Sequence, residues 1–153
     1  MLKFEEDKLE GLLELIQQEK KSSRKKIKLE FNKEYIANAG NAVLEKNSDG
    51  YPVIIITYKI HTSNDQIADY SVRYPLTDTS RTIKMFELSE VLWALREDKV
   101  FIYSQSSTNE ELLNNVVKAI NGKNKVNILF KKEGKPTYYN YKIKRYEEAL
   151  SNE

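Results

Sequence analysis

The side chains that most often carry out catalysis are scarce in this sequence. His61 is the only histidine, cysteine is absent, and the five glycines are too scattered to form a Gly-rich phosphate-binding loop. A Ser-His-Asp site would have to use His61, which at a strand end is more often structural or solvated. Cysteine nucleophiles, disulfides and thiolate zinc sites are excluded. Asp65 and Asp69 are weak evidence for a metal site, so we expect a protein that is not an enzyme and needs no metal or cofactor.

Aromatic and basic residues, in contrast, are frequent and interleaved. The chain has ten tyrosines and five phenylalanines, and lysine and arginine alternate with them in segments that have a β-strand pattern. This mixture suits single-stranded nucleic acid, because cations follow the phosphates and each base that stacks on a ring adds about 1–3 kcal/mol. The competing explanation is that strands favour tyrosine and that many of these rings fill the core.

Charge is segregated along the chain although the net charge is only +2. Residues 1–19 carry −4, residues 20–28 carry +6, residues 123–146 carry +7 and the tail at 147–153 carries −3. Such a distribution favours an anionic partner that meets particular faces of the fold. Because the segment at 123–146 is also rich in tyrosine, we expect it to have a surface role.

Length and composition predict one domain over residues 1–153. Hydrophobic residues make up 40% of the chain and charged residues 31%, which is typical of a globular protein. No apolar run approaches the roughly 20 residues that span a bilayer, and the first residues are acidic where a signal peptide is basic. The lack of cysteine suits a reducing compartment. We therefore expect a cytoplasmic protein with no membrane partner.

The first segment predicts an amphipathic helix over residues 3–21. Leu9, Leu12, Leu13 and Ile16 have the i, i+3, i+4, i+7 spacing of one helical face. This face fits either a homodimer or protein-partner contact or docking onto the chain's own core, and the sequence leaves both open.

The middle of the chain has the alternating pattern of β-strands. Ile27, Leu29 and Phe31 begin a predicted strand that continues to about Leu44, with a bend or bulge at Gly40. A β-meander then follows, with a turn at 47–50, a strand at 53–60, a turn at 62–65 and a strand at 68–76.

The remaining part predicts two helices and a closing hairpin. The first helix is expected at about 86–96, with residues 100–103 as a strand or as the anchor of a connector. Thr108 and Glu111 form a capping box for the second helix, which ends at Asn121-Gly122. The hairpin is expected to have strands at 126–131 and 137–146, a loop at 132–136, and Tyr139, Tyr141 and Ile143 on one face.

This order of elements resembles the OB fold, in which a long bent strand, a meander, a helical insertion and a closing hairpin follow each other. Within that fold, the chain is similar to the small phage-encoded single-stranded-DNA-binding proteins. The resemblance covers residues about 27–146 and is carried by YPVIIITYKIHTSNDQIADYSVRYPL and ELLNNVVKAINGKNKVNILFKKEGKPTYYNYKIKRY. The matching steps are Gly122-Lys123, Val126-Asn127-Ile128, Glu133-Gly134-Lys135 and Tyr139-Asn140.

The resemblance implies an α+β chain with an OB-fold-like antiparallel β-barrel and a two-helix insertion before the closing hairpin. The N-terminal helix lies outside the resemblance, and the short acidic tail at 147–153 lacks the terminal phenylalanine of many bacterial single-strand-binding proteins. OB folds bind ligands on the face of strands 2 and 3 and on the adjoining loops.

On this sequence the implied binding residues are Lys46, Tyr51, Lys59, Arg73, Lys131, Lys132, Lys135 and Tyr138, with Thr57 and Ser71 on the same face as Lys59 and Arg73. We expect the lysines and the arginine to contact phosphates, and Tyr51 and Tyr138 to stack on bases. Nothing in this set indicates base-specific recognition.

Two functional hypotheses are compatible with these features. The preferred one is binding of single-stranded DNA or RNA without sequence specificity, by a protein of phage type that acts in the cytoplasm of a bacterial host. The alternative is a protein-binding module, such as a phage-encoded inhibitor of a host enzyme or defence protein. The sequence does not decide between DNA, RNA and protein as the ligand.

Overall fold

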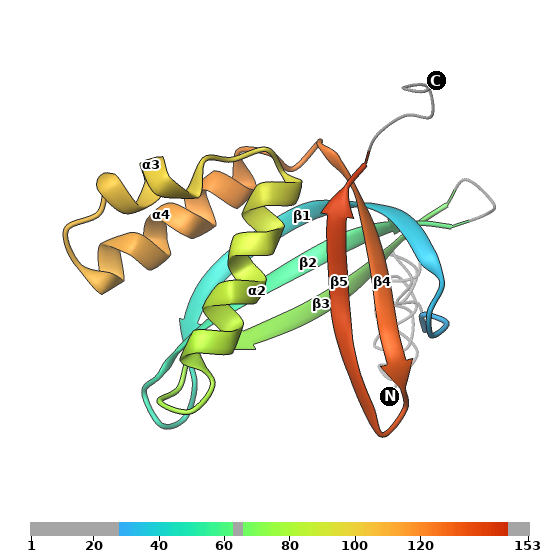
Figure 1. Ribbon diagram of the computed structural model, residues 1–153, viewed down its shortest axis with the longest axis horizontal. Helices are drawn as coiled ribbons and strands as arrows, with labels where there is room; N and C mark the ends of the chain where they lie inside the picture. Colours follow the sequence, from blue (N-terminus) through green and yellow to red (C-terminus); the bar gives the residue numbers. More distant parts are fainter. Residues whose placement is uncertain (1–27, 63–65, 147–153) are drawn as a thin grey trace, which may run out of the picture.

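The computed structural model describes residues 28–62 and 66–146 (Figure 1). The predictions for a helix at 3–21, for Ile27, for most of the turn at 62–65 and for the acidic tail lie outside these residues. The elements are β1 (Glu34–Lys46), β2 (Pro52–His61), β3 (Ile67–Pro75), α2 (Arg81–Ala94), α3 (Lys99–Ser104), α4 (Asn109–Asn121), β4 (Asn127–Lys135) and β5 (Tyr138–Arg145).

The strands form one antiparallel sheet in the order β3-β2-β1-β4-β5. β1, β2 and β3 are the predicted meander, and β4 and β5 are the predicted hairpin, which crosses the meander at a steep angle in Figure 1. The α+β class, with helices inserted between meander and hairpin, is therefore confirmed. The sheet is open, because β3 and β5 are its two edges and the strand ladder does not join them.

β1 bends at Gly40. Its register with β2 shifts across this residue, which is the bulge that the sequence predicts. A side chain here would displace Lys59, because a Cβ on Gly40 would lie 2.8 Å from both Cγ and Cε of Lys59. The bend lets β1 serve two partners, since residues 34–38 pair with β4 and residues 37–46 pair with β2.

The prediction that this strand already includes residues 28–33 is wrong, because β1 begins only at Glu34. Phe31 makes a single isolated bridge to β4, and Asn32 has a left-handed backbone with a φ of 65° that interrupts the extended chain. The Asn32 side chain makes the hydrogen bonds to β4 that the backbone of a strand would otherwise make. Its amide nitrogen donates to the Gly134 carbonyl (3.2 Å), and its Oδ1 accepts from the Gly134 N–H (3.0 Å).

The closing hairpin is longer than predicted. The expected loop at 132–136 shrinks to the turn Pro136-Thr137, because β4 and β5 remain paired almost to their ends. Gly134 stays within the ladder at a φ of 132°, and a Cβ there would lie 2.5 Å from the Tyr138 carbonyl oxygen. The glycine and proline indicate a loop locally, but Asn32, remote in sequence, holds this part of β4 in the sheet.

The insertion contains three helices in the described part of the chain, where two were predicted. α4 begins as expected, with the Glu111 N–H donating to the Thr108 hydroxyl (3.0 Å). Residues 100–103, predicted as a strand or a connector, belong instead to α3, which begins after Asp98 because Asp98 Oδ1 accepts from two backbone N–H groups of its first turn (3.0 and 3.1 Å). No helix among the described residues is long and apolar enough to cross a membrane.

The core lies between the helices and the inner face of the sheet. α4 packs on β1, and α2 contacts both edge strands, β3 and β5. Tyr58 and Tyr74 share a buried hydroxyl–hydroxyl hydrogen bond of 2.7 Å, and burial raises the pKa of both phenols. A second such bond, Tyr70 to Tyr141 (2.7 Å), links β3 to β5 where the ladder is open. The largest fully buried side chains are Tyr58, Tyr74, Phe130, Ile54, Ile56, Ile60, Leu76, Leu88, Leu95, Ile120 and Ile128.

Candidate functional site

The sheet has an outer face, opposite the core, where the strands present their polar side chains. Side chains alternate along a strand, so the neighbours of the core residues point to this face. β2 and β3 place four of the predicted residues there, and β4 and β5 place three. The outer-face set is Thr57, Lys59, Ser71 and Arg73 on the meander, and Lys131, Lys135 and Tyr138 on the hairpin, together with Asn140, Lys142 and Lys144.

On the meander, the outer-face side chains satisfy one another across the strands. Thr57 and Ser71 share a hydroxyl hydrogen bond of 2.9 Å, and Lys59 Nζ lies 3.2 Å from Asp69 Oδ1. The Lys59 stem also covers Gly40. Arg73 is exposed and has no ion-pair partner among the described residues. Of the two cations predicted here, Arg73 is therefore the one that is available to a phosphate.

An asparagine network continues the outer face from β2 across β1 to β4. Asn38 Nδ2 donates to Asn127 Oδ1 (2.8 Å) and to the Val126 carbonyl (3.1 Å), while its Oδ1 is bonded to His61 Nε2 (2.8 Å). The single histidine thus has a structural partner. The sequence does not reveal this network, because its members become neighbours only once the strand register is set.

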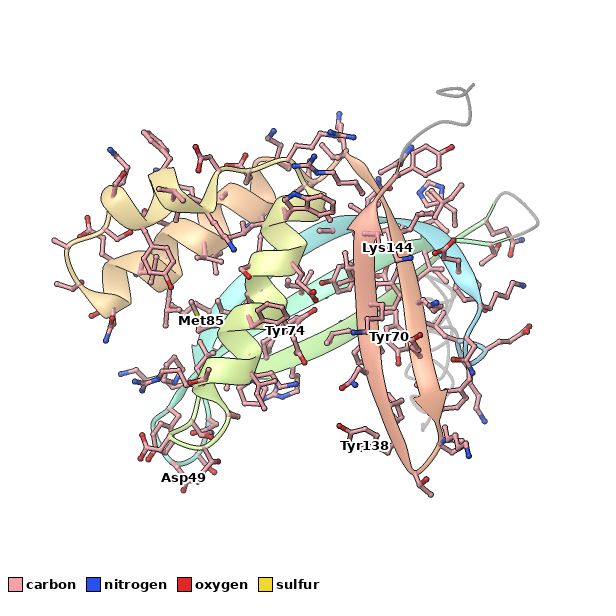
Figure 2. All side chains as sticks on the ribbon, in the orientation of Figure 1. Asp49, Tyr70, Tyr74, Met85, Tyr138 and Lys144 are labelled. Carbon is pink, nitrogen blue, oxygen red and sulfur yellow. The ribbon has the colours of Figure 1, made fainter. Side chains whose placement is uncertain are left out.

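The hairpin carries a different pattern. Lys131 and Lys142 are directly opposite each other in the register of β4 and β5, and both point to the outer face. Like charges opposite each other in an antiparallel pair destabilise it. Lys144 lies one step along the same face, and Lys135 is opposite Tyr138 beside the turn. Figure 2 shows Lys144 and Tyr138 near the two ends of β5.

Only part of this charge is neutralised. Lys131 Nζ lies 3.7 Å from a Glu133 oxygen, and Lys144 Nζ lies 3.8 Å from a Glu34 oxygen. Lys135 and Lys142 are exposed and have no ion-pair partner among the residues that the structure describes. Tyr138 is 76% exposed, which is more than any other large hydrophobic or aromatic residue described. The hairpin thus combines surplus positive charge with a free aromatic ring.

Lys132 does not join this surface. It lies on the inner side of the hairpin, where its Nζ is 4.7 Å from the centre of the Phe31 ring and 4.5 Å from that of Tyr139. The two rings meet edge to face at 5.5 Å. The Lys132 ammonium group, predicted to contact a phosphate, is instead held in a cation–π interaction, which is worth about 0.5–2 kcal/mol. The alternation of a continuous β4 separates Lys132 from its neighbour Lys131.

Lys46 and Tyr51 lie at the other end of β1, around the turn to β2. The turn has the predicted form, with Gly50 at a φ of 88° and its N–H bonded to the Asn47 carbonyl (2.9 Å). Tyr51 donates its hydroxyl to Asp78 Oδ2 (2.9 Å), and this hydrogen bond raises the pKa of the phenol. Its hydroxyl is thus engaged. The hairpin pairs with the beginning of β1, whereas Lys46 is the last residue of β1. The structure therefore does not bring Lys46 and Tyr51 together with the predicted residues of the hairpin.

The comparisons with known proteins find no match: no family model, curated protein sequence or solved structure is similar to this chain. Among the described residues, no three histidine, cysteine, aspartate or glutamate side chains gather where a metal ion could be held. A function is therefore inferred from the surfaces of the molecule alone.

Proposed function

We propose that the chain binds single-stranded nucleic acid without sequence specificity along the outer face of the β4–β5 hairpin. The observation that carries this proposal is the direct opposition of Lys131 and Lys142. A pair of like charges lowers the stability of the hairpin, and sites that break a rule of stability are often functional. A phosphate backbone laid along the hairpin would turn this repulsion into attraction and release counterions.

Exposed side chains supply the other half of the binding chemistry. Tyr138 offers a free ring beside Lys135, and a base stacked on such a ring adds about 1–3 kcal/mol. Arg73 and the hydroxyls of Thr57 and Ser71 extend the same face across the meander. None of these groups is arranged to read the edge of a particular base. DNA is the preferred ligand on the resemblance to phage-type proteins, and RNA has the same backbone charge.

The arrangement of the strands supports an OB-type assignment as part of this proposal. In OB folds a five-stranded Greek-key barrel is partly open, and ligands bind to the face of strands 2 and 3 and to the adjoining loops. The shared strand β1, its bend at Gly40 and the helices between β3 and β4 agree with that layout. The contact of Tyr70 with Tyr141 is consistent with a barrel whose seam is joined by side chains.

The test is the binding of fluorescent oligo-dT, measured by anisotropy at several salt concentrations beside a duplex of equal length. We expect binding that weakens steeply with salt and that prefers the single strand. The slope of log K against log salt is negative, and the variant Lys135→Gln/Lys142→Gln should make it shallower by about 1.4, or about 0.7 for each lost phosphate contact. The variant Lys99→Gln/Lys118→Gln removes the same charge from the helical side and should leave the slope unchanged. Absence of binding at low salt would end the proposal.

A second function, the binding of a protein partner, is favoured by a separate observation on the helices. Three apolar residues on α2 are more than half exposed: Ile83 (61%), Phe86 (62%) and Trp93 (52%). Val100 and Phe101 of α3 are exposed to 69% and 59%. By their spacing Ile83, Phe86 and Trp93 fall on one side of α2, and an exposed apolar helix face often marks an interaction site, such as that of an inhibitor of a host enzyme.

Variants separate the two functions. A purified partner that binds in a fixed ratio, resists nuclease and is lost in Phe86→Ser but kept in Lys135→Gln/Lys142→Gln would favour protein binding. Loss of that partner in the lysine variant alone would instead indicate that it competes for the hairpin.

A further inference from the structure

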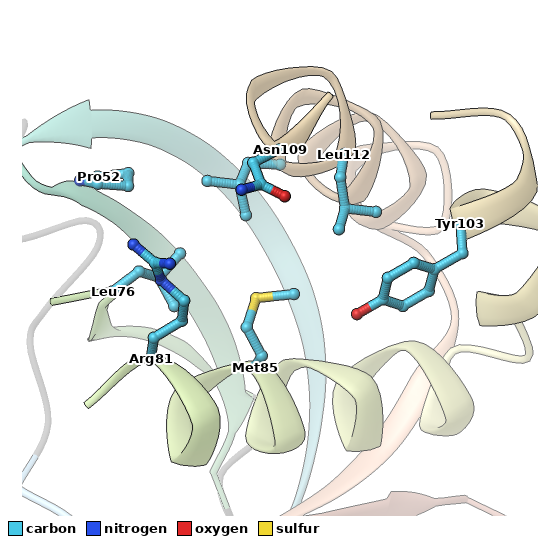
Figure 3. A pocket seen from close by; sticks show the side chains of 8 residues that line it. Pro52, Leu76, Arg81, Met85, Tyr103, Asn109 and Leu112 are labelled. Carbon is cyan, nitrogen blue, oxygen red and sulfur yellow. The ribbon is translucent and has the colours of Figure 1, made fainter. Parts of the chain in front are cut away.

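A pocket of about 220 Å³ lies on the helical side of the molecule, away from the outer face of the sheet (Figure 3). It is open to solvent on one side and is bordered by α2, α3 and α4 and by residues at the start of β2 and just after β3. Its lining residues are Pro52, Leu76, Arg81, Met85, Tyr103, Asn109, Leu112 and Leu113.

Three polar side chains from three different helices face this space. Arg81 is the first residue of α2, Tyr103 belongs to α3, and Asn109 is the first residue of α4. Figure 3 shows the Asn109 amide and the Tyr103 hydroxyl directed toward the space above Met85, with the Arg81 guanidinium on the opposite side from Tyr103. In the described part of the chain, none of the three side chains has a hydrogen-bond or ion-pair partner.

The rest of the lining is apolar and firmly placed. Leu76, Leu112 and Leu113 are buried, with 1%, 8% and 9% of their surface exposed. Met85 lies between the polar groups, and its unbranched thioether adapts to the shape of a ligand. An apolar pocket with a few convergent polar groups is the usual form of a small-molecule site.

Charge and size restrict the ligand. Arg81 is the only charged residue of the lining, so the pocket favours a negative charge near its guanidinium, whose geometry suits a carboxylate or a phosphate. The volume lies below the roughly 300–1,000 Å³ of sites for drug-sized molecules. The ligand therefore has room for one ring or a short aliphatic body and one acidic group.

We propose that this pocket binds a small organic anion. Arg81 pairs with the acidic group, and the Asn109 amide and the Tyr103 hydroxyl bond its polar substituents. The apolar body rests on Met85 and Leu112. This site is independent of nucleic-acid binding at the hairpin, since the two share no residue, and each can fail without the other.

The test uses phenyl phosphate, benzoate and the neutral benzyl alcohol as probes with the full chain. Binding is followed by the shifts of backbone amide resonances in the NMR spectrum. We expect shifts centred on Arg81, Met85 and Leu112, and affinities for one or both anions that exceed that for benzyl alcohol by at least ~10-fold, because charged hydrogen bonds are the stronger ones. The two anions distinguish phosphate from carboxylate as the acidic group.

Variants decide whether binding takes place in this pocket. Arg81→Gln, at an exposed position, should weaken anion binding by about 10-fold, while Lys118→Gln, which removes one charge outside the pocket, should have no effect. Met85→Trp should abolish binding of all probes by filling the space. No shifts at about 10 mM probe, equal binding of inorganic phosphate, or binding that survives Arg81→Gln would each overturn the proposal.

Discussion

The β2–β3 pair of the meander and the β4–β5 hairpin are both antiparallel, yet their outer faces differ in how opposite side chains match. In β2–β3, Lys59 is opposite Asp69 and Thr57 is opposite Ser71, and each pair is in contact. In β4–β5, Lys131 is opposite Lys142. Complementary pairs contribute stability and like charges reduce it. Cross-strand side-chain pairs therefore add to the stability of β2–β3, whereas the Lys131–Lys142 pair subtracts from that of the hairpin.

The largest expected difference between the two regions concerns their glycines. Gly134→Ala in the hairpin should cost about 3 kcal/mol, because a positive φ is strained for alanine and the new Cβ would meet backbone. Gly40→Ala in β1 should cost about 1 kcal/mol, since its Cβ meets only the flexible Lys59 side chain. Urea denaturation measures both, and equal costs would show that the hairpin is no more constrained than the meander.

The seam between the two regions gives the next effect. Tyr141→Phe removes one hydroxyl of the Tyr70–Tyr141 bond and should cost about 1 kcal/mol of unfolding free energy. Tyr70→Phe in the same background should then add little, because the partner is already lost. Full additivity of the two changes would contradict a direct bond between the edge strands.

Substitution of one lysine in each cross-strand pair should change the free energy of unfolding in opposite directions. Lys59→Met keeps the alkyl stem over Gly40 but removes the ion pair with Asp69, and should cost about 0.5 kcal/mol. Lys142→Glu replaces repulsion of Lys131 by attraction and should stabilise the protein by about 0.5 kcal/mol. The same change should weaken oligo-dT binding. A Lys142→Glu protein that is more stable and also binds oligo-dT more tightly would contradict a binding role for the Lys131–Lys142 pair.

The smallest effect concerns Tyr51, in the turn between β1 and β2. The hydrogen bond to Asp78 raises the pKa of Tyr51, so its phenolate should form at a higher pH than in Asp78→Asn. A raised pKa means that the folded state holds the phenol proton more tightly than the unfolded state does. The hydrogen bond therefore stabilises the fold below pH about 10, and this stabilisation disappears as the pH rises through the folded-state pKa. NMR titration of the Tyr51 ring measures it, and identical titrations in both proteins would exclude the bond.

Local chemistry made much of the fold predictable. The bulge at Gly40, the turn ending at Gly50 and the cap at Thr108 each depend on residue types within a few positions, and all three are confirmed. The length of the hairpin was not predictable in this way. The glycine and the proline predict a loop around Gly134. The hydrogen bonds that keep Gly134 in the strand come from Asn32, about a hundred residues away, so the local sequence does not indicate them.

The candidate site was predictable only in part, for a related reason. Lys131, Lys135 and Tyr138 were identified by type, and they share one face. Lys142 was not selected, because its opposition to Lys131 depends on the register. Lys132 was grouped with its neighbours because the predicted loop concealed the alternation of the strand.

The position of β5 at the edge of the sheet gives its lysines a further consequence. An edge strand presents unpaired N–H and C=O groups that can pair with a strand of another molecule, and charged side chains along it are a common protection against this. We therefore expect Lys142 and Lys144 to disfavour such pairing between copies of the chain at high concentration. A variant that loses both charges should be less soluble as well as a poorer ligand binder, so light scattering belongs beside every binding measurement on the hairpin.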